Sequence, residues 1–170
     1  MVLKLRPPCT IIWGSAPALH FATHGALTGQ VQGSAEPRLI LTPPAKDASD
    51  PEALERDDGF LTASEIATLK LDADWVILSA CNTAGAQSEN AEALSGIARA
   101  FFYAGARALL VSHWEVGSEA AVKLTTRAFA ELKGNPKIGR AEAFRLSMKE
   151  LVETGSLANA HPTMWAPFVV

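Results

Sequence analysis

Residues 75–83 read WVILSACNT, and this stretch decides the class of fold. Its first four residues form a short, continuous apolar run, which is the pattern of a strand buried on both faces of a parallel sheet. Along the chain, similar apolar runs alternate with longer segments of helical period, and this alternation is typical of an α/β domain. We therefore predict a three-layer αβα sandwich around a mostly parallel central sheet.

The composition is that of one soluble globular domain. The chain has 170 residues, of which 48% are hydrophobic and 19% are charged, enough apolar material for a single core. The net charge is -3 and no basic stripe is present, so we expect no nucleic-acid partner. The apolar runs are far shorter than the roughly 20 residues that span a bilayer, and we expect no membrane segment. Only two cysteines occur, Cys9 and Cys81, which implies no disulfide framework and favours a cytoplasmic location.

The order of elements follows from the apolar pattern. Thr62 and Glu65 match a capping box that opens a short helix ending near Leu69. The strand expected at 38–42 lies off the central sheet, alone or as half of a hairpin with the region near Phe60. Each long helix is expected to return the chain for another parallel strand. We predict strands over 18–22, 38–42, 75–80, 108–114 and 165–170, and long helices over 91–104, 118–133 and 140–152, which end at Gly105, Gly134 and Gly155.

Apolar stripes on the long helices predict which side chains are buried. The first stripe includes Phe101 and Phe102, and the second includes Val122 and Leu124. Three tryptophans at strand ends are also expected in the core: Trp75, Trp114 and Trp165.

A histidine and a cysteine each stand where a predicted strand ends. The strand 18–22 runs into His24 and Gly25, and the strand 75–80 runs into Cys81. Ligands meet the carboxyl ends of strands in an open parallel sheet, so neighbouring strands would bring the imidazole and the thiol within about 4–7 Å of each other. A protonated imidazole favours the thiolate, and the amides of Gly25 and Cys81 are candidates for an oxyanion hole. This set suffices for cysteine-dependent acyl transfer. The alternative is that Cys81 is an apolar filler and His24 a turn residue.

Metal and phosphate sites have little support in the sequence. His20 and His24 have neither a third ligand nor a cysteine pair at zinc spacing. The Asp-Asp-Gly at 57–59 indicates a turn, because a calcium loop needs further acidic ligands at fixed positions. No Gly-Lys-Ser/Thr follows the loop 83–86, so it is not a phosphate-binding loop. We expect no cofactor.

Six collinear stretches resemble the CHAT family, a group of caspase-like cysteine peptidase domains often associated with tetratricopeptide repeats. The resemblance implies a caspase-like fold and a cysteine endopeptidase in which His24 is the general base and Cys81 the nucleophile of a dyad. The spacing of these two residues also fits the roughly 50 residues by which a caspase histidine precedes its cysteine. The stretches are LHFATHG at 19–25, DGFLTASEI at 58–66, VILSACNTA at 76–84, ARAFFYAGAR at 98–107, VSHW at 111–114 and HPTMWAPF at 161–168.

The same resemblance implies a protein or peptide substrate, a tetratricopeptide-repeat partner and a bacterial regulatory or defence role. It places three residues in substrate binding: Ser112, Trp114 and Ser118. The family usually carries one or two aspartates after its Trp-x-Val pattern, whereas this chain has Gly117 and Ser118 there. Carboxylates that would favour a basic substrate side chain are thus missing, and Glu115 or Glu119 are the acidic residues available to replace them. The second hypothesis is a CHAT-type regulatory or interaction module with weak or no catalytic activity.

The start of the chain is short for such a domain. Caspase-like domains normally place further strand–helix units before the histidine strand, whereas only residues 1–17 precede the first predicted strand. This segment is rich in Pro and Gly and does not predict a strand–helix pair. We expect an irregular segment over 1–17 and a CHAT-like domain over 18–170 that lacks the first strand–helix units, which leaves one sheet edge unpaired.

Overall fold

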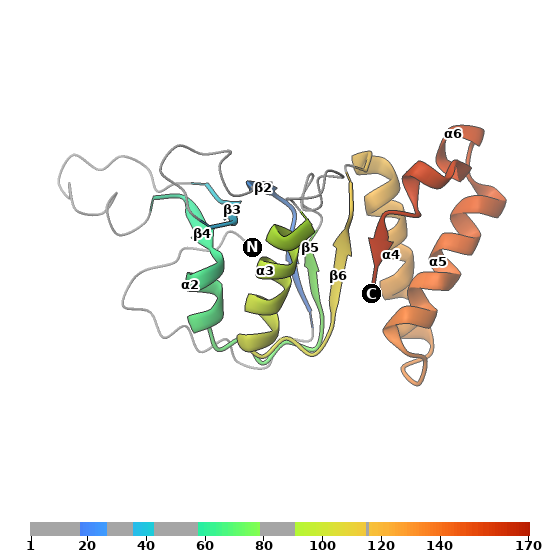
Figure 1. Ribbon diagram of the computed structural model, residues 1–170. Coiled ribbons are helices and arrows are strands. Elements are labelled where there is room, and N and C mark those ends of the chain that lie inside the picture. Colours follow the sequence, from blue (N-terminus) through green and yellow to red (C-terminus); the bar gives the residue numbers. More distant parts are fainter. Residues whose placement is uncertain (1–17, 27–35, 43–57, 79–90, 115) are drawn as a thin grey trace.

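A computed structural model describes residues 18–26, 36–42, 58–78, 91–114 and 116–170 (Figure 1). The elements in chain order are β1 (Leu19–Phe21), β2 (His24–Ala26), β3 (Arg38–Ile40), β4 (Phe60–Thr62), α2 (Ala63–Thr68), β5 (Val76–Leu78), α3 (Ala91–Tyr103), β6 (Leu109–Ser112), α4 (Ser118–Gly134), α5 (Arg140–Thr154), α6 (Leu157–Ala160), the 3-10 helix η1 (Pro162–Met164) and β7 (Phe168–Val169). Within these residues, no helix is both long enough and apolar enough to cross a bilayer.

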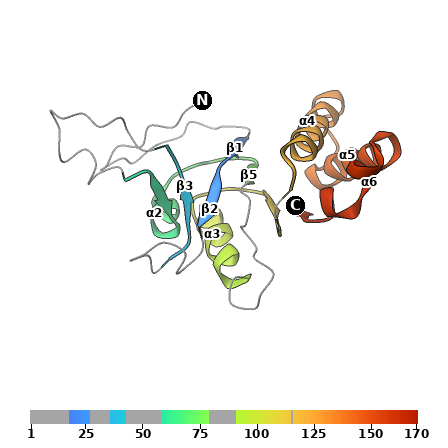
Figure 2. The same ribbon diagram turned by 90° about the horizontal axis from the view of Figure 1, so that it is seen from above.

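The central sheet has the strand order β1-β5-β6-β7. Strands β1, β5 and β6 are parallel, and β7 pairs antiparallel with β6. Successive side chains of a strand point to opposite faces of the sheet, and β5 is buried on both faces. Val76 and Leu78 pack in a first core with α2 and α3, and Ile77 packs in a second core with α4 and α5. Figure 2 shows α3 and the α4–α5 pair on different sides of the sheet. The predicted α/β class with a mostly parallel sheet is confirmed.

The last strand runs against the prediction that every helix leads to another parallel strand. β6 ends at the upper edge of the sheet in Figure 1, α4 descends from there, and α5 climbs back. A single crossover helix would return the chain to the end of the sheet where β6 begins. The antiparallel pair α4 and α5 instead leaves the chain at the end where β6 finishes. The following strand, β7, therefore runs antiparallel to β6, with Val111 opposite Val169 and Ser112 opposite Phe168.

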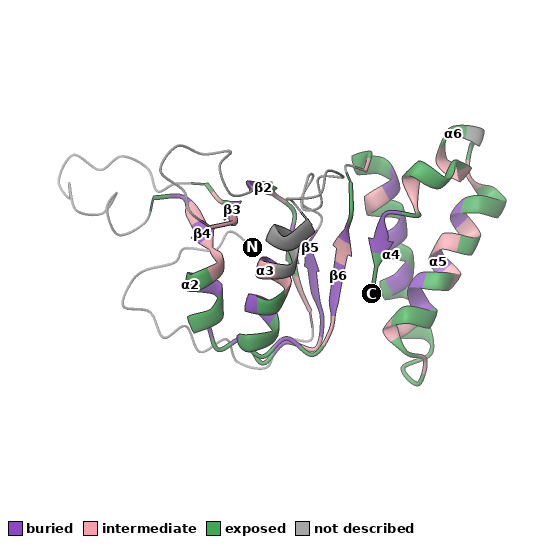
Figure 3. Ribbon diagram, in the orientation of Figure 1, coloured by how far each residue is buried: buried purple, intermediate pink, exposed green. Residues whose placement is uncertain are grey.

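The helix stripes are only partly as predicted (Figure 3). Phe101 and Leu124 are fully buried, but Phe102 is 53% exposed and Val122 is 61% exposed. Their predicted burial is wrong, because with 3.6 residues per turn each side chain points well away from the buried positions of its own helix. Of the three tryptophans, Trp75 is buried as predicted, Trp165 is half-buried against the second core, and Trp114 is exposed.

A small antiparallel sheet, β2-β3-β4, stands apart from the central sheet. The pairing of Ile40 with Phe60 confirms the hairpin interpretation of this region. At the end of β4 the predicted capping box is present: the Glu65 backbone N–H donates to the Thr62 hydroxyl at 3.2 Å, and the Thr62 N–H donates to the Glu65 carboxylate at 2.8 Å. These bonds satisfy N–H groups that the first turn of α2 leaves without helical partners.

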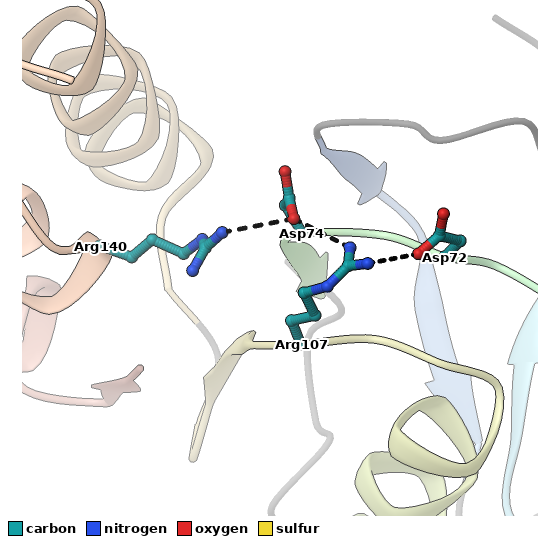
Figure 4. A network of polar contacts seen from close by, with 4 residues as sticks. All are labelled: Asp72, Asp74, Arg107 and Arg140. Carbon is teal, nitrogen blue, oxygen red and sulfur yellow. Dashed lines mark hydrogen bonds and ion pairs between the residues drawn. The ribbon is translucent and has the colours of Figure 1, made fainter. Parts of the chain in front are cut away.

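Ion pairs connect the linkers at the end of the central sheet where β5 and β6 begin (Figure 4). Arg107, just before β6, donates to both Asp72 and Asp74, and its Nη1 lies 2.9 Å from the Asp74 carboxylate. Arg140, the first residue of α5, approaches the same carboxylate at 3.8 Å. The linker before β5 and the linker between α3 and β6 pass close to each other, which explains the glycine at 105. Gly105 has a φ of +99°, and an added Cβ would lie 3.4 Å from the Asp72 backbone nitrogen.

Candidate active site

The candidate site lies at the carboxyl ends of β1 and β5. The two strands are parallel neighbours, with Phe21 opposite Leu78 at their ends. His24 follows Phe21 by three positions, and Cys81 follows Leu78 by the same number. Cys81 lies outside the described residues, so its predicted distance from the His24 imidazole stays a prediction. The register nevertheless brings the two strands that lead to these residues to one edge of the sheet, as the sequence argument requires.

His24 is held more firmly than a residue in a turn. It begins β2, opposite Ile40 of β3, and its side chain is exposed. The preceding Thr23 hydroxyl donates to the Ile40 carbonyl oxygen. The chain therefore leaves the central sheet after β1 and enters the small sheet at once. Sequence reasoning missed β2, because its partner β3 is distant in the chain and the three residues carry no alternating apolar pattern.

Gly25, the proposed oxyanion donor, lies next in β2 opposite Leu39 and is half-buried. Leu39 is completely buried in the first core. The backbone at Gly25 is thus anchored through its ladder partner to the main body of the fold. Its role in binding an oxyanion stays a prediction, as does that of the Cys81 amide.

His20 belongs to a different strand from His24. It lies in β1 opposite Ile77, and burial of part of the ring lowers the pKa of its imidazole. The structure thus separates two histidines that the sequence pattern placed on one strand. Among the described residues, no group of three or more His, Cys, Asp or Glu side chains is arranged to hold a metal ion.

The residues expected to bind substrate gather around the carboxyl end of β6. Ser112 is buried at 3% exposure and lies opposite Phe168 of β7, so its hydroxyl is not a surface group. Trp114 is 40% exposed, and its indole N–H donates to the carbonyl oxygen of Thr163 at 3.1 Å. Ser118 is exposed at the first position of α4. The loop between β6 and α4 therefore offers Trp114 and Ser118, rather than Ser112, to a ligand.

Two further polar side chains lie in this loop or next to it, His113 and Glu119. His113 is exposed, and its backbone N–H donates to the Pro167 carbonyl at 2.9 Å. The carboxylate of Glu119 lies 2.6 Å from Lys123 Nζ and 3.5 Å from Asn159 Nδ2. Its hydrogen bond to Lys123, more than any other contact, lowers the pKa of Glu119. Glu119 therefore carries a charge that is already paired; Glu115 lies outside the described residues.

A groove of about 460 Å³ lies elsewhere, between α4 and α5. It is lined by residues including Val122, Arg127, Glu150 and Thr154, and the ion pair between Arg127 and Glu150 joins its two walls at 2.7 Å. None of the residues at the ends of β1, β5 or β6 lines it. This groove thus lies away from the proposed chemistry.

Comparison with known proteins agrees with this architecture. The family model "CHAT domain" matches residues 9–170. Tetratricopeptide repeat protein 28 of Mus musculus is 34% identical over 133 residues, and its Homo sapiens counterpart is 32% identical over 133 residues. Each alignment covers 73% of this chain but 5% of the relative's length. No solved structure matches the chain significantly. Matched over nearly its whole length, with the α/β architecture described above, the chain belongs to the CHAT domain family of caspase-like folds.

Proposed function

We propose that this domain is a caspase-like cysteine endopeptidase with a His24–Cys81 dyad. The observation that carries the proposal is the parallel register of β1 and β5, which directs the chain segments before His24 and Cys81 to the same edge of the sheet. The exposed position of His24 at the start of β2 leaves its imidazole accessible to a substrate. Membership of the CHAT family supports the same assignment.

The chemistry follows from these two groups. The Cys81 thiolate attacks the peptide carbonyl carbon, and the Gly25 and Cys81 amides donate to the oxyanion that develops. Collapse of the tetrahedral intermediate breaks the C–N bond, and the His24 imidazolium gives its proton to the departing amine. His24 then takes a proton from water, which attacks the thioester. Collapse of this second tetrahedral intermediate breaks the C–S bond, which releases the carboxylic acid and restores the Cys81 thiolate and the His24 imidazolium with which the cycle began.

Substrate choice is proposed not to depend on a basic side chain. Gly117 and Ser118 stand where the resemblance expects acidic residues, and the nearby Glu119 is paired with Lys123. A paired carboxylate attracts a second cation less strongly than a free one. Peptides with uncharged side chains before the scissile bond are therefore proposed as the preferred substrates.

The second candidate is a regulatory or interaction module without peptidase activity. It is favoured by the same missing acidic pair and by relatives that are named for tetratricopeptide repeats. In this reading a tetratricopeptide-repeat protein is the proposed partner, and the cytoplasm the proposed location.

Labelling with thiol-directed peptide probes separates the two candidates. Peptide acyloxymethyl ketones with basic, acidic and apolar side chains are incubated with the protein, and mass spectrometry locates the adduct. We expect modification of Cys81 in the wild type and in Cys9→Ala, the matched cysteine control, and none in Cys81→Ala. His24→Gln should slow labelling strongly, whereas His20→Gln should not. Absence of labelling by every probe, in protein shown to be folded by circular dichroism, would refute the peptidase and leave the interaction module.

A further inference from the structure

The segment from Ser156 to Met164, which contains α6 and η1, has no role in the proposed dyad. It lies at the upper end of the molecule beside the start of α4, near the edge where β6 ends (Figure 1). It also contains the beginning of the HPTMWAPF stretch. Its Thr163 carbonyl accepts a hydrogen bond from the loop between β6 and α4. The structure describes residues 113, 114, 116 and 117 of this loop, here called the recognition loop.

The sequence of η1 leaves one carbonyl oxygen ready for an outside donor. Pro162 begins the 3-10 helix, and the Trp165 and Ala166 N–H groups both donate to its carbonyl, at 3.2 and 2.8 Å. The next donor that a helical turn would offer to the Thr163 carbonyl belongs to Pro167, which has no N–H. The Thr163 carbonyl is therefore one of the unsatisfied acceptors that a helix end leaves.

Trp114 of the recognition loop supplies the missing donor to the Thr163 carbonyl. Its indole N–H donates to the Thr163 carbonyl at 3.1 Å, which fixes the edge of the ring and leaves 40% of the residue exposed. The His113 backbone N–H donates to Pro167, one step further along the same stretch. An added Cβ at Gly117 would lie 3.8 Å from Met164 Sδ, so the far end of the loop lies close to η1.

His161 sets the position of Thr163. It is the N-cap of η1: its Nδ1 accepts the Thr163 backbone N–H at 3.4 Å and lies 2.9 Å from the Thr163 hydroxyl oxygen. Both contacts constrain the residue whose carbonyl receives the Trp114 indole. Since the cap, the helix and the acceptor follow one another within three residues, a change at the His161 side chain shifts the Thr163 carbonyl and, through it, the Trp114 indole.

We propose that His161 and Thr163 are positioning residues that hold the recognition loop in its substrate-binding conformation through Trp114. This inference rests on the proposed function for the identity of the ligand, a peptide. It assigns no proton transfer to either residue. The effect of disrupting them therefore falls on peptide binding and selectivity rather than on the rate of bond formation at Cys81.

Two matched pairs of variants test the proposal. Trp114→Phe keeps an aromatic ring but removes the N–H donor; Trp165→Phe removes an equivalent indole bond, to the Ala160 carbonyl at 3.1 Å, that does not reach the recognition loop. His161→Ala removes the cap acceptor. His161→Asn keeps it, because the asparagine Oδ1 occupies the place of Nδ1 along the side chain and asparagine is a strong N-cap.

Probe labelling is measured over a range of concentrations, to separate the half-saturating concentration from the maximal rate at Cys81. We expect Trp114→Phe and His161→Ala to raise the half-saturating concentration by about 2- to 12-fold, the effect of one hydrogen bond, with the maximal rate unchanged. His161→Asn and Trp165→Phe should stay near wild type. Equal losses in Trp165→Phe and Trp114→Phe, no rescue by His161→Asn, or a fall in the maximal rate alone would overturn the proposal.

A second readout keeps this proposal separate from the peptidase itself. Cys81→Ala protein carrying 5-fluorotryptophan is titrated with the unreactive peptides that correspond to the probes, and the Trp114 fluorine resonance is assigned with Trp114→Phe. A peptide-dependent shift of this resonance that His161→Ala weakens supports the positioning role, even if no probe labels the wild type. A resonance that no peptide moves refutes it, even if Cys81 is labelled.

Discussion

Replacing Leu39 by alanine tests whether the small sheet that carries His24 is anchored to the main core. Leu39 is the central residue of β3, is completely buried, and lies between Gly25 of β2 and Leu61 of β4. Truncation of a buried leucine to alanine costs about 2.7–5 kcal/mol, from lost transfer free energy and the cavity left behind. For a chain of this size, that loss lowers the melting temperature by about 5–20 °C.

The neighbouring Ile40 supplies the control. It belongs to the same strand but points to the other face and is 37% exposed, so Ile40→Ala should cost less than about 1.5 kcal/mol. Urea unfolding, followed by far-ultraviolet circular dichroism and by tryptophan fluorescence, gives the free energy of unfolding of both variants. If the two variants lose the same free energy of unfolding, within about 0.5 kcal/mol, then Leu39 does not face the core. In that case Gly25 and His24 are not anchored to the core through β3.

Three further predictions follow from single contacts. Gly155→Ala should destabilise the protein by about 1–3 kcal/mol, because its added Cβ would lie 2.2 Å from the Leu151 carbonyl oxygen; Gly117→Ala, with 3.8 Å to its nearest neighbour, should be almost neutral in the same urea experiment, and the reverse order would contradict the geometry. Gly117→Asp should favour labelling by probes with Arg or Lys over apolar probes by about 2- to 5-fold; an unchanged ratio would show that the recognition loop does not face the substrate. The contact with Lys123 lowers the pKa of Glu119, so it stabilises the fold above the ordinary glutamate pKa and is lost as the pH falls through the lowered value. Glu119→Gln should therefore melt below wild type at neutral pH, and the two melting temperatures should converge as the pH falls below the lowered pKa of Glu119; a gap that persists in acid would count against this ion pair.

Much of the candidate site could be predicted because its residues follow from local pattern. The apolar run of β5 and the polar residues after it mark the end of a buried strand wherever that strand lies in the sheet. The same pattern singles out His24 as a candidate, but it does not predict β2, the strand that holds this residue. The pairing of β2 with β3 is a contact between segments that no local pattern links, so the sequence offers no signal for it.

The region around the carboxyl end of β6 also combines features that local sequence predicts with features that it does not. Ser112 and Trp114 were both candidates for substrate binding, but the pairing of β6 with β7 buries the first and leaves the second exposed. The hydrogen bond from Trp114 to Thr163 could be anticipated only in part: the His-Pro start of η1 and the proline at 167 predict an unpaired carbonyl, but not which donor fills it.

The sequence by itself determined the features that depend on neighbours within a few residues. Among these are the capping box at Thr62 and Glu65, the end of α3 at Gly105, and the alternation of apolar runs and helices that sets the α/β class. Only the tertiary structure decided the direction of β7, the exposure of Phe102 and Val122, and the placing of His24 in a separate small sheet. The physical reason is range: caps and turns are satisfied by bonds inside the segment, whereas strand register and burial depend on which distant surfaces the chain brings together.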